Sequence, residues 1–506
     1  MLPAPARTPP PEETADYVNL EPVVEWVRRR DPVRWALFGM IAVWSVVFIS
    51  LGWRRHTHYA TFGFDLGIYD QGIWLLSRFR DPFVTVRGLD LFGHHTNFIL
   101  ILLVPFYWLG AGPLFLLVVQ VVAQGLGAVA VYLLARDRLE ARWPAVAVAG
   151  TLLLHPTYQF HVWEWFHPDV LAVPAVLFAY WAARAKRWGW FAVAAVVAAL
   201  CKEDVALALL VIGVLVAVRG ERRIGATVAA ASAAWFLVCT RMLLPFFNGI
   251  GPFYDSLFGE FGRSPTEVVG HVLTHPGDAL EVATEPDRMN YYRMMLAPVA
   301  FLPLLAIPTL FIGLPMLGVN VLSTLPFLRD SKYHWSALVL AGVMLATVEA
   351  IAWLARTPAL RAFLIGLVVA TSFASTVAWG PSPFSTQYRN GYWPFGPDPR
   401  LAVKQAAAAT VPDGAPTSAV YLFVPQMAHR DKIYEFPVPW KPINWGVDGE
   451  NLHDPSGVEW LVLDRMLLSA DDKAFVNGLL AHEFAVRFDK DDILVAERVN
   501  PPPLRP

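Results

Sequence analysis

Acidic side chains stand beside apolar segments at several points of this 506-residue chain, where they could act as general bases. Asp65 lies in the run GFDLG (63–67), between apolar neighbours. A general base needs a carboxylate held in such a partly dehydrated place, so Asp65 is the candidate catalytic residue. The same residue could instead cap a helix, because an aspartate before an apolar run is a normal helix start. Asp70 is expected to point elsewhere.

A charged triplet, Lys202, Glu203 and Asp204, interrupts the apolar block 189–218. Charges at membrane depth are costly and indicate a functional site. Lys202 could hold a phosphate by point-charge attraction, and the two carboxylates are candidate ligands of a divalent metal. The alternative is a structural one, in which Lys202 is neutralised by a neighbouring carboxylate.

Histidines supply a second kind of candidate. His94 and His95 could contact a phosphate or a metal, although the spacings HxH and HxxxH, which favour metal binding, do not occur there. Adjacent histidines also lie at lipid headgroup depth for no catalytic reason. Tyr333 and His334 stand in a short polar turn and are further candidates for binding the substrate.

His161, Glu164 and His167 are spaced at i, i+3 and i+6. On a continuous helix this spacing would keep all three broadly on one side. His161 and Glu164 are therefore candidate metal ligands, and His167 is a candidate substrate-binding residue. The aromatic residues between them are typical of a membrane interface and also of a surface that stacks on a sugar ring.

The composition places these residues in a membrane protein. Hydrophobic residues make up 56% of the chain and charged residues 16%, against about 25% charged in an ordinary soluble domain. A water-soluble enzyme is excluded. The formal net charge of -2 argues against a nucleic-acid-binding surface. The two cysteines lie inside apolar segments and do not indicate a disulfide framework.

Basic residues predict which way the chain crosses the membrane. Arg28, Arg29, Arg30 and Arg34 precede the first apolar run, so the N-terminal tail 1–34 is expected to be cytoplasmic. About eleven membrane-spanning helices then follow within 35–380. They are expected at 35–53, 113–135, 143–157, 168–183, in two arms of 189–218, and at 224–246, 294–310, 311–328, 336–354 and 361–379.

The number of membrane crossings required between the basic clusters, odd or even, places the candidate residues on one side of the membrane. Basic clusters flank the block 189–218 at both ends, so it is expected to form a hairpin whose tip is the charged triplet. Residues 54–112 become one large external loop, with a re-entrant or interfacial segment at 96–109. The external surface is then expected to collect Asp65, Asp70, His94, His95, His155, His161, Glu164, His167, Asp169, the charged triplet, Tyr333 and His334.

The hydropathy falls after about residue 381, and short alternating elements replace the long apolar blocks. We expect residues 381–506 to form an extracytoplasmic α/β domain. Its strands are predicted near 417–423, 432–435, 459–464, 484–488 and 492–498, with helices near 399–410 and 471–482. No glycine-rich phosphate loop supports nucleotide binding.

Several motifs together resemble a bacterial family of multi-pass membrane proteins known as a domain of unknown function. They are FDLGIYDQ (64–71), FHPD (166–169), KEDVAL (202–207), YHWSA (333–337), PDGAP (412–416), PQMAHR (425–430) and WLVLD (460–464). The resemblance spans roughly residues 60–465. The family in turn looks like the GT-C superfamily of glycosyltransferases.

The resemblance implies an α-helical, GT-C-like fold in the bacterial plasma membrane. It implies transfer of a sugar from a polyprenyl-phosphate donor to a glycan or lipid acceptor of the cell envelope, at the external leaflet. Asp65 would be the base, the other candidate residues would bind the donor phosphate and the substrate, and a divalent metal (Mg or Mn) is left open. A different function, transport or flipping of a polar lipid or ion beneath the charged triplet, is the main alternative, and a non-catalytic assembly factor is a third.

Overall fold

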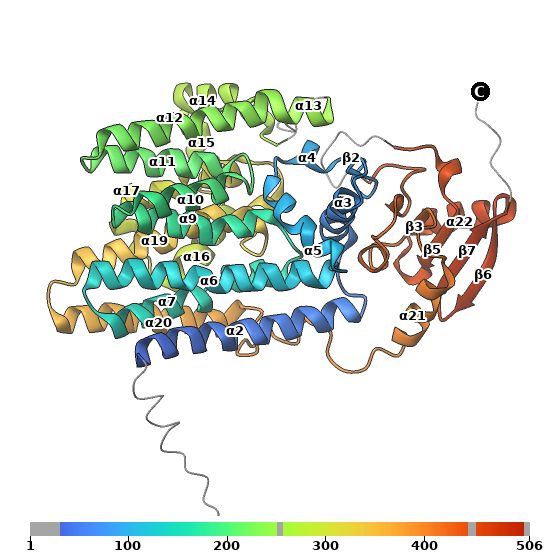
Figure 1. Cartoon of the computed structure of the whole chain (residues 1–506), viewed down its shortest axis with the longest axis horizontal. Helices are drawn as coiled ribbons and strands as arrows, with labels where there is room; N and C mark the ends of the chain where they lie inside the picture. Colours follow the sequence, from blue (N-terminus) through green and yellow to red (C-terminus); the bar gives the residue numbers. More distant parts are fainter. Residues whose placement is uncertain (1–30, 250–256, 444–451, 500–506) are drawn as a thin grey trace, which may run out of the picture.

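The computed structural model describes residues 31–249, 257–443 and 452–499. Most of the predicted cytoplasmic tail, 1–34, therefore lies outside the described residues. Long helices run side by side along the molecule, and a small sheet lies at one end of them (Figure 1). The chain is thus an α-helical membrane protein with a C-terminal α/β module.

Within the described residues, five helices are long and apolar enough to cross a membrane by length and composition. They are α2 (Pro32–Thr57), α6 (Pro113–Leu139), the run Arg222–Asn248 formed by α12 (Arg222–Val238), η3 (Cys239–Leu243) and α13 (Leu244–Asn248), α19 (Ala337–Leu354) and α20 (Pro358–Trp379). Shorter helices pack among them, namely α7 (Arg142–Leu154), α8 (Pro156–Trp163), α9 (Pro168–Arg184), α10 (Trp188–Ala199) and α11 (Val205–Val218). The count of eleven spans stays a prediction.

The predicted hairpin at 189–218 is confirmed. Lys186 and Glu221, just beyond its two arms, form an ion pair of 2.7 Å, so both ends lie together. The arms α10 and α11 have 12 and 14 residues, which corresponds to about 18 and 21 Å of helix. Both are shorter than the roughly 30 Å of hydrocarbon in a bilayer, so we expect the charged tip to lie within the depth of the membrane.

The predicted straight span 294–310 is wrong. After α16 the backbone turns through left-handed conformations at Ala300 and Phe301, with φ of 53° and 57°. Proline lacks an N–H and clashes with the preceding helical turn, so Pro298 and Pro303 prevent a continuous helix. A neighbouring helix supplies a hydrogen bond to this irregular backbone, because Ser372 Oγ on α20 donates to the Pro298 carbonyl at 2.7 Å. The elements here are α16 (Pro286–Leu296), η5 (Ala297–Val299) and η6 (Leu302–Leu305), followed by α17 (Ile307–Leu310), η7 (Phe311–Gly313) and α18 (Leu314–Leu322).

The loops at the module end hold short elements. The segment predicted to be re-entrant or interfacial, 96–109, forms one short apolar helical run, Phe98–Trp108, in which η2 continues directly into α5. Residues 54–112 form η1 (Gly63–Gly67), α3 (Ile68–Ser77), an unpredicted antiparallel pair β1 (Phe83–Val84) and β2 (Leu89–Asp90), then α4 (Leu91–His94), η2 (Phe98–Leu103) and α5 (Val104–Trp108). The later loop holds η4 (Gly259–Phe261), α14 (Pro265–Thr274) and α15 (Pro276–Ala283).

The five strands and two helices predicted for the C-terminal part are confirmed. The strands lie in the order β4-β3-β5-β7-β6, with β3 parallel to β4 and β5, and β7 antiparallel to β5 and β6. Their bounds are β3 (Thr417–Ala419), β4 (Ile433–Glu435), β5 (Trp460–Asp464), β6 (Phe484–Lys490) and β7 (Ile493–Arg498), and the helices are α21 (Leu401–Thr410) and α22 (Ala470–His482).

The C-terminal module is tied to the first loop by the segment 424–435. The Thr85 hydroxyl donates to the Ile433 carbonyl at 2.6 Å and accepts from the Ile433 N–H at 2.9 Å. A Cβ added at Gly63 would come within 2.7 Å of Val424, and one at Gly67 within 2.8 Å. Glycine is therefore required in η1 because Val424 occupies the space of a side chain.

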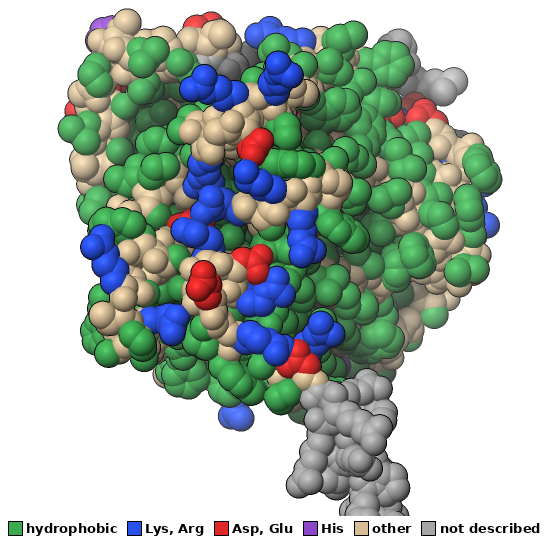
Figure 2. Space-filling view, turned by 60° about the vertical axis from the view of Figure 1, so that its left-hand side comes forward, with side chains coloured by type: hydrophobic (Ala, Val, Ile, Leu, Met, Phe, Trp, Pro, Cys, Tyr) green, Lys and Arg blue, Asp and Glu red, His purple; other side chains and the backbone are tan. Residues whose placement is uncertain are grey.

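The opposite end of the molecule is basic. Lys and Arg side chains gather there over the ends of the helices (Figure 2). At the same end, buried Glu349 of α19 accepts from Arg138 at 2.9 Å, from Arg184 at 2.8 Å and from the Tyr180 hydroxyl at 3.0 Å. This network pins α6, α9 and α19 together.

Candidate functional site

Asp65, Glu164, His167 and His334 meet at the end of the helices that faces the C-terminal module. The Nε2 atom of His167 lies 3.6 Å from Asp65 Oδ2 and 3.7 Å from Glu164 Oε1. His334 Nδ1 lies 2.9 Å from Glu164 Oε1, and its ring stacks on that of His167 with centroids 3.6 Å apart. Three segments distant in sequence thus supply one cluster, as the predicted one-sided gathering requires.

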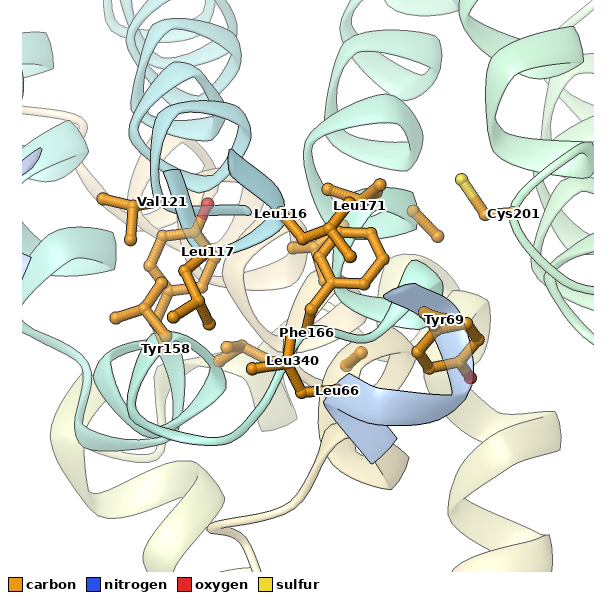
Figure 3. Close-up of a cluster of buried hydrophobic side chains, with 14 of the residues drawn as sticks. Leu66, Tyr69, Leu116, Leu117, Val121, Tyr158, Phe166, Leu171, Cys201 and Leu340 are labelled. Atoms are coloured by element: carbon orange, nitrogen blue, oxygen red, sulfur yellow. The ribbon is translucent and has the colours of Figure 1, made fainter. Parts of the chain in front are cut away.

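Apolar neighbours aim these polar side chains. Leu66 follows Asp65, Phe166 precedes His167, and both are fully buried. Figure 3 shows their side chains grouped with Leu340 of α19 in the apolar interior. Because successive residues cannot all enter that interior, Asp65 and His167 are left facing the polar cluster.

The predicted helix that would carry His161, Glu164 and His167 together is wrong. α8 ends at Trp163, Glu164 has an extended backbone (φ -59°, ψ 167°), and His167 is the N-cap of α9. The prolines Pro156 and Pro168 begin two separate helices, which breaks the assumed periodicity. Glu164 and His167 reach the cluster, whereas His161 stays in α8, where both ring nitrogens are buried without a hydrogen-bond partner among the described residues.

Glu164 is the buried member of the cluster. Its side chain is 3% exposed, against 23% for Asp65. Burial raises the pKa of Glu164 well above its usual range, and the neighbouring charge of Asp65 raises it further. The His334 backbone N–H donates to Glu164 Oε2 at 2.6 Å and fixes its position. Asp65 is thus the carboxylate that a substrate can reach.

Glu164, His167 and His334 could together hold a metal ion, since one ligand atom of each lies within 4.8 Å of the others. Of the four predicted metal candidates, Glu164 alone belongs to this group; Glu203, Asp204 and His161 do not. Two imidazoles and a carboxylate are a donor set that suits Zn²⁺ better than the Mg or Mn expected from sequence, because those ions prefer oxygen ligands.

Lys202 is paired, as the structural alternative foresaw. Its ammonium lies 2.7 Å from Asp169 Oδ1 and 3.3 Å from Asp204 Oδ2, and 4.5 Å from the centre of the Trp335 ring. The side chain is 1% exposed. A phosphate could reach it only by displacing one of the two carboxylates, so Lys202 and Asp204 form a buried wall of the site.

Glu203 joins the hairpin tip to the first loop. His95 Nδ1 lies 2.8 Å from Glu203 Oε1, and the Thr96 N–H donates to Oε2 at 3.0 Å. The rings of His94 and His95 stack with centroids 4.3 Å apart. Both carboxylate oxygens are therefore committed to protein partners, and the loop caps the tip of the hairpin.

The turn before α19 forms the rim of the site. Tyr333 is half-buried beside His334, and burial raises the pKa of its phenol, with Asp330 adding to the shift. The neighbouring Lys332 ammonium lies 3.1 Å from Asp330 and keeps 36% of its side chain exposed. Lys332 is thus an accessible cation close to the cluster.

Two contributors have no role predicted from sequence. Asp169, expected only among the external residues, is the main partner of Lys202, and its position after Pro168 at the start of α9 was the available signal. Arg55 lies at the end of α2, with its guanidinium 4.0 Å from the ring centre of Trp165 and 4.5 Å from that of Trp163. Arginines at a helix end are typical of a membrane boundary, so its type alone gives no signal for this role.

Comparisons with known proteins place the chain in a family. No curated protein matches its sequence. Among solved structures, the fold is similar to ArnT from Cupriavidus metallidurans in the apo state, with a TM-score of 0.46 and 14% identity over 95% of this chain and 99% of that one. It is also similar to the Archaeoglobus fulgidus oligosaccharyltransferase in complex with Zn and sulfate, with a TM-score of 0.40 and 12% identity over 88% and 71% of the two chains. A family model described as a predicted membrane protein (DUF2079) matches residues 55–477, and the chain therefore belongs to the DUF2079 family.

Proposed function

We propose that this protein is a glycosyltransferase that moves a sugar from a polyprenyl-phosphate carrier to a cell-envelope acceptor. The observation that carries the proposal is the position of Asp65, a partly exposed carboxylate beside the buried group of Glu164, His167 and His334. Three of the motifs that resemble the multi-pass membrane family, FDLGIYDQ, FHPD and YHWSA, supply Asp65, His167 and His334 of this cluster, and the resemblance of that family to the GT-C superfamily supports the same function. By the positive-inside rule, the basic end in Figure 2 is cytoplasmic, which would place the cluster at the external leaflet of a bacterial plasma membrane.

Asp65 would act as the general base. It would take the proton of an acceptor hydroxyl while the acceptor oxygen bonds to the anomeric carbon. The bond from that carbon to the phosphate oxygen breaks, and the polyprenyl phosphate leaves with the electron pair. Attack from the face opposite the leaving group inverts the anomeric centre. Positioning of the two substrates supplies much of the rate, because the leaving group already carries negative charge.

The donor phosphate needs a cation that a lipid can approach. Lys332 meets this need best, because it lies at the rim and both its side chain and that of its partner Asp330 are partly exposed, at 36% and 33%. His167, His334 and Tyr333 would line the pocket beneath it. Lys202, Glu203 and Asp204, with His94 and His95, would hold that pocket in shape through the contacts described above.

A metal held by Glu164, His167 and His334 would supply a Lewis acid for the donor phosphate. The residues fit such an ion because the two ring nitrogens of His167 have no hydrogen-bond partner among the described residues, although the side chain is buried. In either state Asp65 keeps the role of proton acceptor, since it is not a member of that group.

Transport is the less favoured function because the two polar ends are separated by an apolar layer. Residues 337–346 of α19 are all apolar and buried, between Ser336 at one end and Glu349 at the other. This layer is about 15 Å thick along the helix. A polar lipid or ion would have no continuous polar path through the part of α19 that the structure describes.

The proposal is tested by transfer from a radiolabelled polyprenyl-phosphate hexose in proteoliposomes. Asp65→Asn should lower the rate by about 10²- to 10⁴-fold, the usual contribution of a general base. The matched control is Asp278→Asn, which should keep full activity. Asp278 is an exposed carboxylate of α15, and the ion pair that it forms in the described part of the chain is with His271. Full activity of correctly inserted Asp65→Asn would refute the proposal.

A further inference from the structure

A second polar cavity lies where the first loop meets the C-terminal module, and the chemistry proposed at Asp65 does not use it. Its volume is about 680 Å³, within the range of about 300–1,000 Å³ of ordinary ligand pockets. Helix α3 lines one side and the segment 413–430 the other. The side chains that matter are Asp70, Trp74, Arg78, Asp413, Gln426 and His429.

Asp70 is the buried anchor of this cavity. It is 0% exposed, and its Oδ1 accepts a hydrogen bond from the Tyr107 hydroxyl at 2.7 Å and lies 3.2 Å from His429 Nε2. Its Oδ2 has no hydrogen-bond partner within the described ranges. A buried carboxylate oxygen is rarely left without a donor. The missing donor can therefore come from a ligand hydroxyl in the cavity that Asp70 lines.

Two aromatic rings stack on each other beside this anchor. The rings of Trp74 and His429 are nearly parallel, with an angle of 17° and centroids 5.9 Å apart. The pair joins α3 to the C-terminal segment. Aromatic faces of this kind accommodate the apolar face of a ring-shaped ligand while polar groups bind its edge.

The charges around the cavity are balanced. Asp70 and Asp413 are acidic, Arg78 and Arg430 are basic, and the imidazoles of His56 and His429 also line the cavity. An anion would face both carboxylates and a cation would face both guanidinium groups, so neither sign of ligand is matched throughout. A neutral molecule rich in hydroxyl groups can donate to the carboxylates and accept from Arg78 and Gln426.

We propose that this cavity binds a neutral saccharide, and that the saccharide is the acceptor of the transfer reaction. The acceptor role rests on the function proposed above, whereas saccharide binding does not. The η1 element that carries Asp65 continues directly into α3, which carries Asp70. A glycan lying along α3 would thus have one end in the cavity and another directed toward the base.

Binding to an array of neutral, acidic and amino-substituted glycans tests the assignment with the full-length protein. Neutral glycans should bind, and Asp70→Asn should weaken that binding by about tenfold or more, the loss expected for one hydrogen bond to a charged group. Because Asp70 also contacts Tyr107, the exposed variants Arg78→Ala and Asp413→Asn provide a second measurement that does not disturb folding. Asp471→Asn on the distant α22 is the control and should bind as the parent protein does.

The outcomes separate the two proposals. Neutral glycan binding that survives Asp65→Asn but falls in the cavity variants supports the saccharide site, whatever the transfer assay gives. Absence of glycan binding, a preference for charged glycans, or binding unchanged by all three cavity variants would overturn it. If the glycan binds here and transfer is absent, the site stands and the acceptor role fails.

Discussion

Gly67→Ala is the change that tests most sharply how the C-terminal module supports Asp65. Gly67 has φ of -66° and ψ of -36°, so the backbone itself accepts alanine. The obstacle is steric, because the added Cβ would lie 2.8 Å from Val424 Cγ1. Overpacking of this kind costs about 1–3 kcal/mol. The helix preference for alanine over glycine returns about 0.5–1 kcal/mol, which leaves a net destabilisation of up to about 2 kcal/mol.

Val424→Ala should rescue that loss. The substitution removes Cγ1, and by itself costs about 2 kcal/mol for two buried methyl groups. The double variant Gly67→Ala/Val424→Ala should then be no less stable than Val424→Ala alone, a coupling of about 1–3 kcal/mol. The free energy of unfolding by denaturant titration in micelles measures both terms.

Gly63→Ala is the matched control. Its added Cβ would lie 2.7 Å from Val424 Cβ, an atom that alanine at position 424 retains. No rescue is therefore expected for Gly63→Ala/Val424→Ala. Additive costs at Gly67, or equal rescue at both glycines, would refute the packing of Val424 against η1.

The remaining predictions concern burial, pH and metal. Glu349→Gln should cost about 1.5–3 kcal/mol of stability, because it removes a largely buried carboxylate that accepts charged hydrogen bonds from the partly exposed Arg138 and Arg184. Glu221→Gln in a surface pair should cost at most about 1 kcal/mol; equal losses in unfolding titrations would contradict this. Asp70 raises the pKa of His429, although burial opposes it, so the folded state holds this proton more tightly. The contribution of this ion pair to the free energy of unfolding should be fully present below pH ~6.5 and should be lost as the pH rises through the raised pKa of His429. This pH-dependent contribution should be absent in His429→Asn. Equal pH profiles of the parent protein and the variant would contradict the prediction. Zinc should bind at one equivalent by elemental analysis and be lost in His167→Ala; retention of zinc by that variant would exclude the cluster as its site.

Charge patterns predicted one local feature of the membrane domain. The hairpin α10–α11 followed from basic residues at both ends of one apolar block, and Lys186 with Glu221 now joins those ends. The strands of the C-terminal module followed from alternation and turn residues. Both signals are local, so a single sequence contains them.

The site was only partly predictable because its contacts are distant in sequence. Asp70 and His429 are separated by 359 positions, and nothing near either residue indicates the other. Lys202 was open to two interpretations until its pairing with Asp169 in another helix was seen. The span at 294–310 failed for a different reason, since hydropathy does not report how prolines interrupt a helix.

The most direct test of the central claim is a density map of the protein in lipid with a polyprenyl phosphate bound. We expect phosphate density between Asp65, His334 and Lys332, with the lipid chain leaving sideways into the membrane. Phosphate density at the basic end near Glu349, or a polar channel through the apolar layer of α19, would contradict it.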